Sequence, residues 1–114
     1  MCSSDLENAW RHGIVVVAAA GNDGESTSEL ANPAGSPVVV AVGASDPNGT
    51  LGPSDDVVPS WAEHGTAQRP VDVVAPGVHV AGLRVPGSLV DVEYPDAVVG
   101  ERFVRGSEIG RAHV

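Results

Sequence analysis

The sequence predicts an α/β fold with a mostly parallel β-sheet, because it contains two uninterrupted apolar runs that are bounded by turn-forming residues. Residues 14–17 are four consecutive β-branched residues, and residues 38–42 form a second apolar run. Neither run alternates with polar residues, which is typical of strands covered on both faces of a parallel sheet. Both runs are too short to span a membrane. With 114 residues, the chain is long enough for one small domain.

The other elements can be assigned in chain order. Residues 7–12 have the pattern of the last turns of a helix, and Gly13 suits the position just after a helix end. Residues 21–37 are rich in Gly, Asp, Ser, Asn and Pro and predict a long loop. Further along, Pro76-Gly77 predicts a turn between two short strands. The later elements are a turn at residues 46–50, a surface loop at residues 51–57, and strands at residues 71–74, 79–83 and 101–105.

The chain is acidic and has no basic cluster. It contains six Arg, no Lys and 15 Asp plus Glu, for a formal net charge of -9. Binding to nucleic acid or to an anionic membrane needs clustered basic residues, so both partners are excluded. The sequence also has neither a G-x-G-x-x-G pattern nor a P-loop lysine, which argues against a nucleotide-binding domain. We interpret the acidity as a soluble surface.

The most informative stretch is residues 13–24, which read Gly-Ile-Val-Val-Val-Ala-Ala-Ala-Gly-Asn-Asp-Gly. The strand pattern stops abruptly at a polar turn, and three small alanines before the turn leave room for a ligand against the backbone. Asn22 therefore follows the carboxyl end of a buried strand, where open α/β sheets have their ligand crevices. Its side-chain amide can donate a hydrogen bond there. From these residues alone, a turn-forming role for Asn22 is the preferred interpretation.

Three segments together resemble the subtilisin-like serine peptidases, the subtilases. The stretch around Asn22 is similar to their oxyanion-hole strand, residues 32–44 to the next loop and strand, and residues 71–78 to a later Asp-Val-x-Ala-Pro-Gly segment. The three segments occur in the order of the family. The resemblance implies a partial subtilisin-like fold that is truncated at both ends.

The resemblance also implies roles for individual residues. Asn22 becomes the oxyanion-hole donor. Part of the pocket for the substrate side chain before the scissile bond is assigned to four small residues: Ala19, Ala20, Gly21 and Ala31. Pro33 stands where subtilisins carry a cis proline, and the sequence leaves both isomers open.

One segment departs from the family pattern. Residues 59–65, Pro-Ser-Trp-Ala-Glu-His-Gly, occupy the place of Ala-Ser-Phe-Ser-Ser-x-Gly in the subtilases. Trp61 replaces a phenylalanine, and Ala62-Glu63 replaces two serines. The local packing at this segment is therefore the least predictable part of the resemblance.

The resemblance places no member of the catalytic triad within this chain. Subtilases carry the triad in the order Asp, His, Ser, with the first two before the oxyanion strand. Asp23 and Asp72 both come too late to be the triad acid. His64-Gly65-Thr66 matches the first three residues of the His-Gly-Thr-His motif of the family. However, Ala67 replaces the second histidine, and the segment comes after the oxyanion strand instead of before it. We expect a loop histidine there.

Two further residues are also not expected to be catalytic. His79 comes directly after the Ala-Pro-Gly segment and is expected to be structural. The family nucleophile would fall at Gly110, so Ser107 lies three residues short of that role.

Both ends of the chain are expected to be foreign to the domain. Residues 1–6 can be encoded by GTG TGC TCT TCC GAT CT, with GTG read as a start codon. The reverse complement, AG ATC GGA AGA GCA CAC, completes a Glu codon and encodes Ile-Gly-Arg-Ala-His. This DNA resembles a sequencing-library adapter. We therefore expect residues 1–6 and 108–114 to be adapter-derived and residues 7–107 to be a partial catalytic domain. Cys2 then lies outside the native part, so neither a disulfide nor thiol chemistry is expected.

The resemblance implies a fragment of a serine endopeptidase that hydrolyses peptide bonds of peptide or protein substrates through an acyl-enzyme. Without the triad, the fragment is expected to be inactive alone. No cofactor is identified, Asp55-Asp56 lacks a calcium-ligand loop, and calcium is left open for the parent protein. The family default is a secreted parent. The alternative is a non-catalytic subtilase-like domain that binds peptides or proteins, which would require residues 108–114 to be native.

Overall fold

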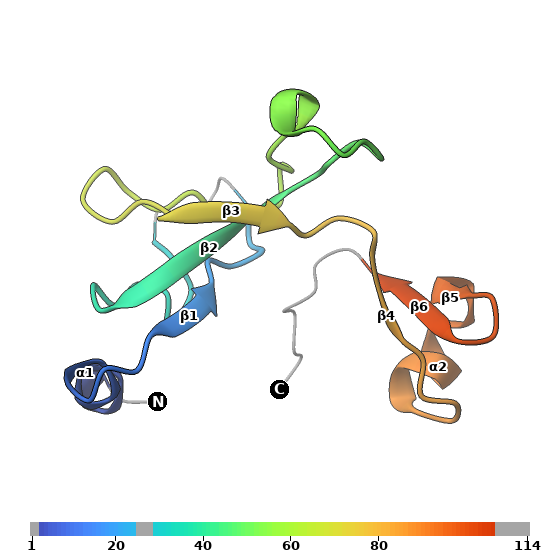
Figure 1. The fold of residues 1–114 in the computed structure, drawn as a ribbon, viewed down its shortest axis with the longest axis horizontal. Helices are drawn as coiled ribbons and strands as arrows, with labels where there is room; N and C mark the ends of the chain where they lie inside the picture. Colours follow the sequence, from blue (N-terminus) through green and yellow to red (C-terminus); the bar gives the residue numbers. More distant parts are fainter. Residues whose placement is uncertain (1–2, 25–28, 107–114) are drawn as a thin grey trace.

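The computed structural model describes residues 3–24 and 29–106, which form two β-sheets with helices at their margins (Figure 1). The first sheet is parallel, and its strand order is β1-β2-β3. It consists of β1 (Val16–Ala19), β2 (Val39–Ser45) and β3 (Val73–Pro76), and helix α1 (Ser3–Arg11) precedes β1. The helix and the parallel sheet confirm the predicted α/β class.

Strand β2 is the centre of the parallel sheet. It pairs in parallel with β1 on one side and with β3 on the other, and its residues alternate between buried and half-buried. The run predicted at residues 38–42 is therefore confirmed as a strand. The core beside it consists mainly of small side chains, with Ala18 and Val71 packed against a buried cluster of Ala20, Leu30, Ala34 and Ala41.

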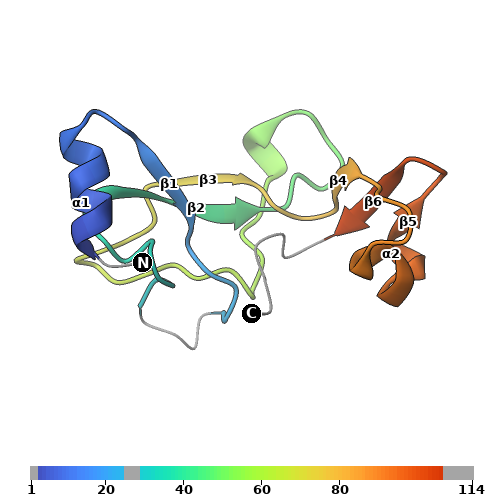
Figure 2. The same ribbon diagram turned by 90° about the horizontal axis from the view of Figure 1, so that it is seen from below.

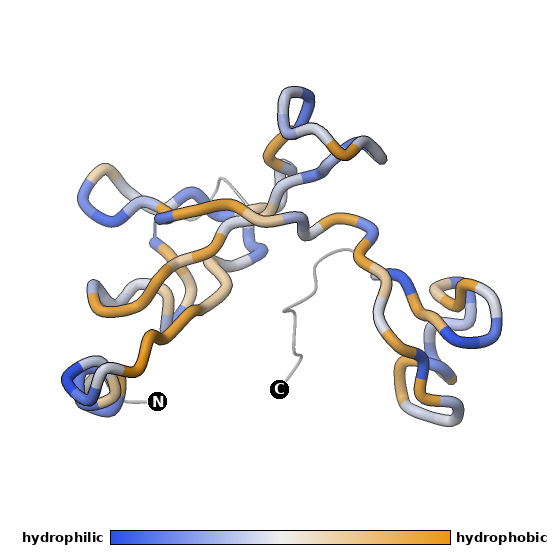
Figure 3. Tube along the Cα trace, in the orientation of Figure 1, coloured by the Kyte–Doolittle hydropathy of each residue, from blue (hydrophilic) through white to orange (hydrophobic). Residues whose placement is uncertain are grey.

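Strand β1 is more exposed than predicted. It begins at Val16, and the side chains of Val15 and Val17 are 64% and 61% exposed. Within the described ranges β1 pairs only with β2, so it lies at an edge of the sheet. The expectation that residues 14–17 are covered on both faces is wrong here, because an apolar strand is buried only where other elements pack on both of its faces. Figure 3 shows hydrophobic residues along the strands of this sheet.

Strand β3 begins at Val73, two residues later than predicted, and extends to Pro76. Pro76 pairs with Ser45 instead of starting the turn. Proline lacks an N–H group, but it fits at the end of an edge strand, where that donor is not needed. The turn starts at Gly77, whose N–H donates to the Ser45 carbonyl at 2.9 Å.

The later part of the chain forms an antiparallel sheet with the order β4-β6-β5. Strands β4 (Val80–Leu83) and β6 (Phe103–Gly106) confirm the strands predicted at residues 79–83 and 101–105. Figures 1 and 2 both place α1 and this second sheet at opposite ends of the molecule. Four short elements were not predicted: η1 (Pro53–Asp55), α2 (Leu89–Glu93), η2 (Pro95–Ala97) and β5 (Val98–Val99). Among the described helices, none has the length and apolar character needed to cross a membrane.

Helix α2 has a start signal that the sequence analysis missed. The Ser88 hydroxyl accepts a hydrogen bond from the Asp91 N–H at 3.3 Å, and the Asp91 carboxylate accepts one from the Gly87 N–H at 2.8 Å. Arg84 forms an ion pair with Asp91, and this contact, together with the weaker effect of the bond from Gly87, lowers the pKa of the Asp91 carboxyl. A serine with an acidic residue three positions later resembles a known helix-capping pattern.

Arg69 and Asp72 join the loop before β2 to the start of β3. Arg69 Nη2 donates to the carbonyl oxygens of Ala34 and Val39, both at 2.8 Å. Arg69 Nη1 donates to Asp72 Oδ2 at 2.9 Å, and the Ala41 N–H donates to the same oxygen at 2.8 Å. The hydrogen bond from Ala41, and after it that from Arg69, lowers the pKa of the Asp72 carboxyl. This network holds three segments together at the amino-terminal side of the sheet.

Replacing Asp72 with asparagine should destabilise the protein in a pH-dependent way. Because folding lowers the pKa of Asp72, its carboxylate stabilises the folded state above the ordinary pKa of 3.8 and loses this contribution as the pH falls through the lowered value. The unfolding free energies of the wild type and Asp72→Asn, measured by urea titration, should differ most near neutral pH and converge in strong acid. Asp96→Asn, an exposed change outside the network, is the control. A constant difference at every pH would contradict this prediction.

Candidate functional site

A groove lies at the carboxyl ends of the three parallel strands. Its volume is about 240 Å³. Because the strands are parallel, the segments that leave them meet at one edge of the sheet, where ligand crevices of such sheets are found. The groove is lined by the end of β1 and the turn after it, the middle of β2, the end of β3 and one aromatic side chain: residues 17–22, 42–44 and 75–77, and Trp61.

The structure brings four of the five predicted site residues to this groove. Ala19, Ala20, Gly21 and Asn22 all line it, and Asn22 is half-buried. Ala31 does not line the groove, but its N–H donates to the Ala20 carbonyl at 2.8 Å. Ala31 therefore lies directly beside the end of β1.

The chain leaves β1 through a backbone conformation that only glycine adopts readily. Gly21 has φ +127°, and a Cβ atom added there would collide with the Glu63 carboxyl group. The Gly21 carbonyl accepts a hydrogen bond from the Glu63 N–H at 3.2 Å, and the Gly24 N–H donates to the Trp61 carbonyl at 2.9 Å. The turn that carries Asn22 is thus attached to residues 61–63 on both sides.

Glu63 does not line the groove but contacts the turn that carries Asn22, and the sequence analysis gave it no role. It is only 3% exposed. Its Oε1 accepts a hydrogen bond from the Asp23 N–H at 3.3 Å, and its Oε2 accepts one from the Ala31 N–H at 2.9 Å. An acidic residue stands where the subtilase pattern has a serine, but this departure does not show that the residue is buried. The sequence therefore predicts no role for Glu63.

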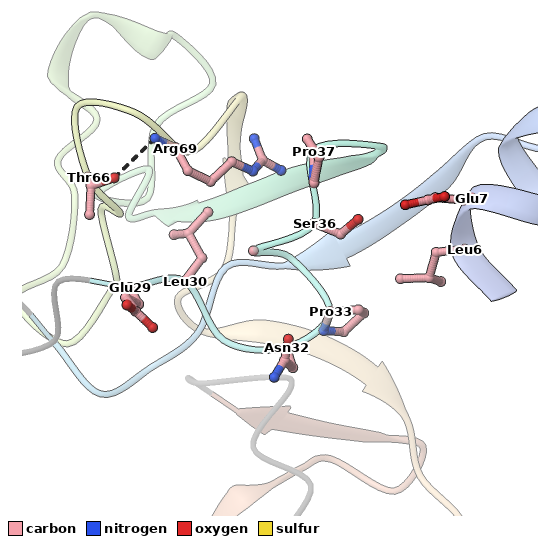
Figure 4. A pocket seen from close by; sticks show the side chains of 11 residues that line it. Leu6, Glu7, Glu29, Leu30, Asn32, Pro33, Ser36, Pro37, Thr66 and Arg69 are labelled. Atoms are coloured by element: carbon pink, nitrogen blue, oxygen red, sulfur yellow. Dashed lines mark hydrogen bonds between the residues drawn. The ribbon is translucent and has the colours of Figure 1, made fainter. Parts of the chain in front are cut away.

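A larger cavity of about 540 Å³ lies elsewhere, between α1 and the loop before β2. Figure 4 shows side chains of α1, of several residues between positions 29 and 37, and of Thr66 and Arg69 around it. Pro33 lines this cavity, and the Asn32-Pro33 peptide bond is cis. Asn22 is not part of its wall, so the smaller groove is the better candidate site.

The other singled-out residues do not line the groove. His64 and His79 are exposed, and Asp72 is engaged with Arg69 and the Ala41 N–H. Asp23 comes next after the groove residues but contributes no wall. In the described ranges, no group of three or more His, Cys, Asp or Glu residues could hold a metal ion. Cys2, Ser107 and Gly110 lie outside the described residues.

Comparisons with known proteins agree on one family. Residues 1–102 match the subtilase family. Serine protease AprX of Bacillus subtilis (strain 168) is 39% identical over 102 residues, which cover 86% of this chain and 23% of AprX. A thermophilic serine proteinase of Bacillus sp. (strain AK1) is 45% identical over 82 residues, 68% of this chain and 18% of that protein. The chain thus spans less than a quarter of the length of these curated relatives.

Solved structures show the same likeness. The prenylagaramide maturation protease PagA has a TM-score of 0.62 and 26% identity, covering 91% of this chain and 29% of PagA. The psychrophilic subtilisin-like protease Apa1 from the Antarctic psychrotroph Pseudoalteromonas sp. AS-11 has a TM-score of 0.53 and 26% identity, covering 71% of this chain and 16% of Apa1. These likenesses confirm the predicted partial subtilisin-like fold.

Replacing Gly21 with alanine should destabilise the protein by about 1–3 kcal/mol, because the new residue is strained at positive φ and its Cβ meets the Glu63 carboxyl group. Gly82→Ala is the matched control, since a Cβ atom at Gly82 has no neighbour within 4 Å. Urea unfolding of both variants measures the difference. Equal stability of the two variants would contradict the close packing described at Gly21.

Proposed function

The chain belongs to the subtilase family, and from this premise we propose that it is part of a serine endopeptidase that hydrolyses peptide bonds through an acyl-enzyme. The observation that carries the proposal is the position of Asn22, half-buried on a groove at the carboxyl ends of three parallel strands. The curated relatives are named as serine proteases or proteinases. Peptides or proteins are therefore the proposed substrates.

In this proposal Asn22 donates a hydrogen bond from its side-chain amide to the substrate carbonyl oxygen. Negative charge develops on that oxygen as the nucleophile attacks. A donor that is already in position stabilises this charge more than it stabilises the ground state, so it lowers the barrier rather than only strengthening binding. The backbone hydrogen bonds of Gly21 and Gly24 to residues 61–63 support such preorganisation, because they hold the turn on both sides of Asn22.

The small residues before Asn22 form the proposed wall for the substrate. This part of the groove wall has no bulky side chains, because it consists of Ala19, Ala20 and Gly21. Ala31 extends the wall beside them through its backbone bond to Ala20. A pocket of this kind would receive the substrate side chain that precedes the scissile bond.

The nucleophile, general base and acid are proposed to come from parts of the protein outside residues 7–107, so this chain alone should not turn over substrate. Support comes from the groove itself, since its wall contains neither a histidine nor an acidic side chain among the described residues. The match covers only 23% of the length of AprX, so a protein of that size has enough further residues to supply the nucleophile, the base and the acid. Residues 1–6 and 108–114 remain, in this proposal, adapter-derived.

Genomic DNA across the codons for Gly106 and Ser107 tests where the nucleophile lies. We expect codons for Gly-Thr-Ser directly after the Ser107 codon, because the subtilase pattern continues in that way. If the genome instead encodes Glu108-Ile109-Gly110, the nucleophile is absent and a subtilase-like domain that binds peptides or proteins becomes the better interpretation.

Replacing Asn22 with alanine in the full-length protein should lower kcat about 10²–10³-fold and change KM little. This magnitude is the loss known for removal of one such donor from a subtilisin and is not calculated from this structure. The measurement is steady-state hydrolysis of a chromogenic peptide substrate. Asn8→Ala, an exposed change on α1, is the control and should leave kcat unchanged. Full kcat in Asn22→Ala would exclude the oxyanion role.

A further inference from the structure

Glu63 contacts the peptide groups on both sides of Asn22. The peptide group before Asn22 contains the Gly21 carbonyl, which accepts the Glu63 N–H at 3.2 Å. The peptide group after it contains the Asp23 N–H, which donates to Glu63 Oε1 at 3.3 Å. Main chain and side chain of a single residue therefore restrain both backbone torsions of Asn22. Its side chain can then vary only by rotation about its own bonds.

The second oxygen of the same carboxyl group reaches the substrate-pocket segment. Glu63 Oε2 accepts the Ala31 N–H at 2.9 Å, and that N–H is shared with the Ala20 carbonyl at 2.8 Å. A Cβ atom added at Gly21 would collide with the carboxyl group, so the two residues are closely packed. Glu63 thus connects the turn carrying Asn22, the end of β1 and the segment of Ala31.

The burial of Glu63 requires an explanation. A buried carboxyl group is costly unless its oxygens accept hydrogen bonds, and here two backbone N–H donors supply them. Both donors belong to segments that the proposed function uses. A serine side chain, as in the subtilase pattern, has only one oxygen and cannot span the two segments in this way.

We infer that Glu63 is a positioning residue, whose buried carboxyl group fixes the oxyanion donor Asn22 and the pocket segment of Ala31 relative to each other. We call the hydrogen bonds of Glu63 to the turn of Asn22 and to Ala31 the tether. The effect on kcat rests on the proposed function, whereas the existence of the tether does not. Glu63 is not assigned as a catalytic acid or base. It is buried, and both carboxyl oxygens already accept hydrogen bonds from the backbone.

The test compares Glu63→Ala, Glu63→Gln and the control Glu93→Gln in the full-length protein. Glu93 is an exposed residue of α2, in the region of the second sheet. Glu63→Ala removes both acceptors and should lower kcat by up to about 10²-fold, because a small misplacement of a catalytic group has effects of this size. Glu63→Gln keeps one acceptor oxygen, so it should recover part of the loss. Glu93→Gln should behave as the wild type.

A double-mutant cycle separates positioning from general destabilisation. If Glu63 acts through Asn22, Glu63→Ala should lower kcat in the wild type but add little in an Asn22→Ala background. An equal loss in both backgrounds, or unchanged kcat in Glu63→Ala, would overturn the inference while leaving the proposed function intact. A loss in Glu63→Gln confined to substrates with Arg or Lys before the scissile bond would also overturn it, since Glu63 would then recognise substrate charge.

Amide hydrogen exchange tests the tether without any assay of catalysis. The Asp23 N–H should exchange faster in Glu63→Ala than in the wild type, while the Gly24 N–H, bonded to the Trp61 carbonyl, should change less. Unchanged exchange at Asp23 would contradict the tether. If the wild-type protein has no serine-dependent peptidase activity, the proposed function and the kinetic role fail together, and the exchange result still decides whether the tether exists.

Discussion

The parallel pairing of β2 with both β1 and β3 is the constraint on which the candidate site depends. Because all three strands point in one direction, the chain leaves each of them at the same edge of the sheet. The turn after β1, the middle of β2 and the end of β3 together form the groove at that edge. Antiparallel pairing of either neighbour would carry one of these segments to the opposite edge and remove a wall of the groove. Topology therefore places Asn22 on the groove before any side-chain contact does.

Side-chain contacts then determine how firmly Asn22 is held. Gly21 and Glu63 lie far apart in the sequence, yet they are in direct contact in the structure. The carboxyl group occupies the space that a Cβ atom at Gly21 would need, and the Gly21 carbonyl accepts the Glu63 N–H. Burial of this carboxyl group is costly unless its oxygens accept hydrogen bonds. The N–H groups of Asp23 and Ala31 donate to the two carboxyl oxygens and offset that cost.

Local patterns in the sequence predicted the parts of the structure that local interactions determine. The apolar run at residues 38–42 became β2, and Gly13, with φ +76°, comes after α1 as expected. The placement of Asn22 after β1 also results from a strand pattern that ends at a polar turn. Helix α2 was missed although its start signal at Ser88 is local, because turn-forming residues on both sides concealed a helix of only five residues.

The remaining differences come from interactions between distant segments. The exposure of Val15 and Val17 depends on what packs against β1, which no pattern within residues 14–17 can specify. The role of Glu63 depends on N–H groups that precede it by 32 and 40 positions. An acidic residue in a loop is usually solvated, so only the fold could reveal that this one is buried.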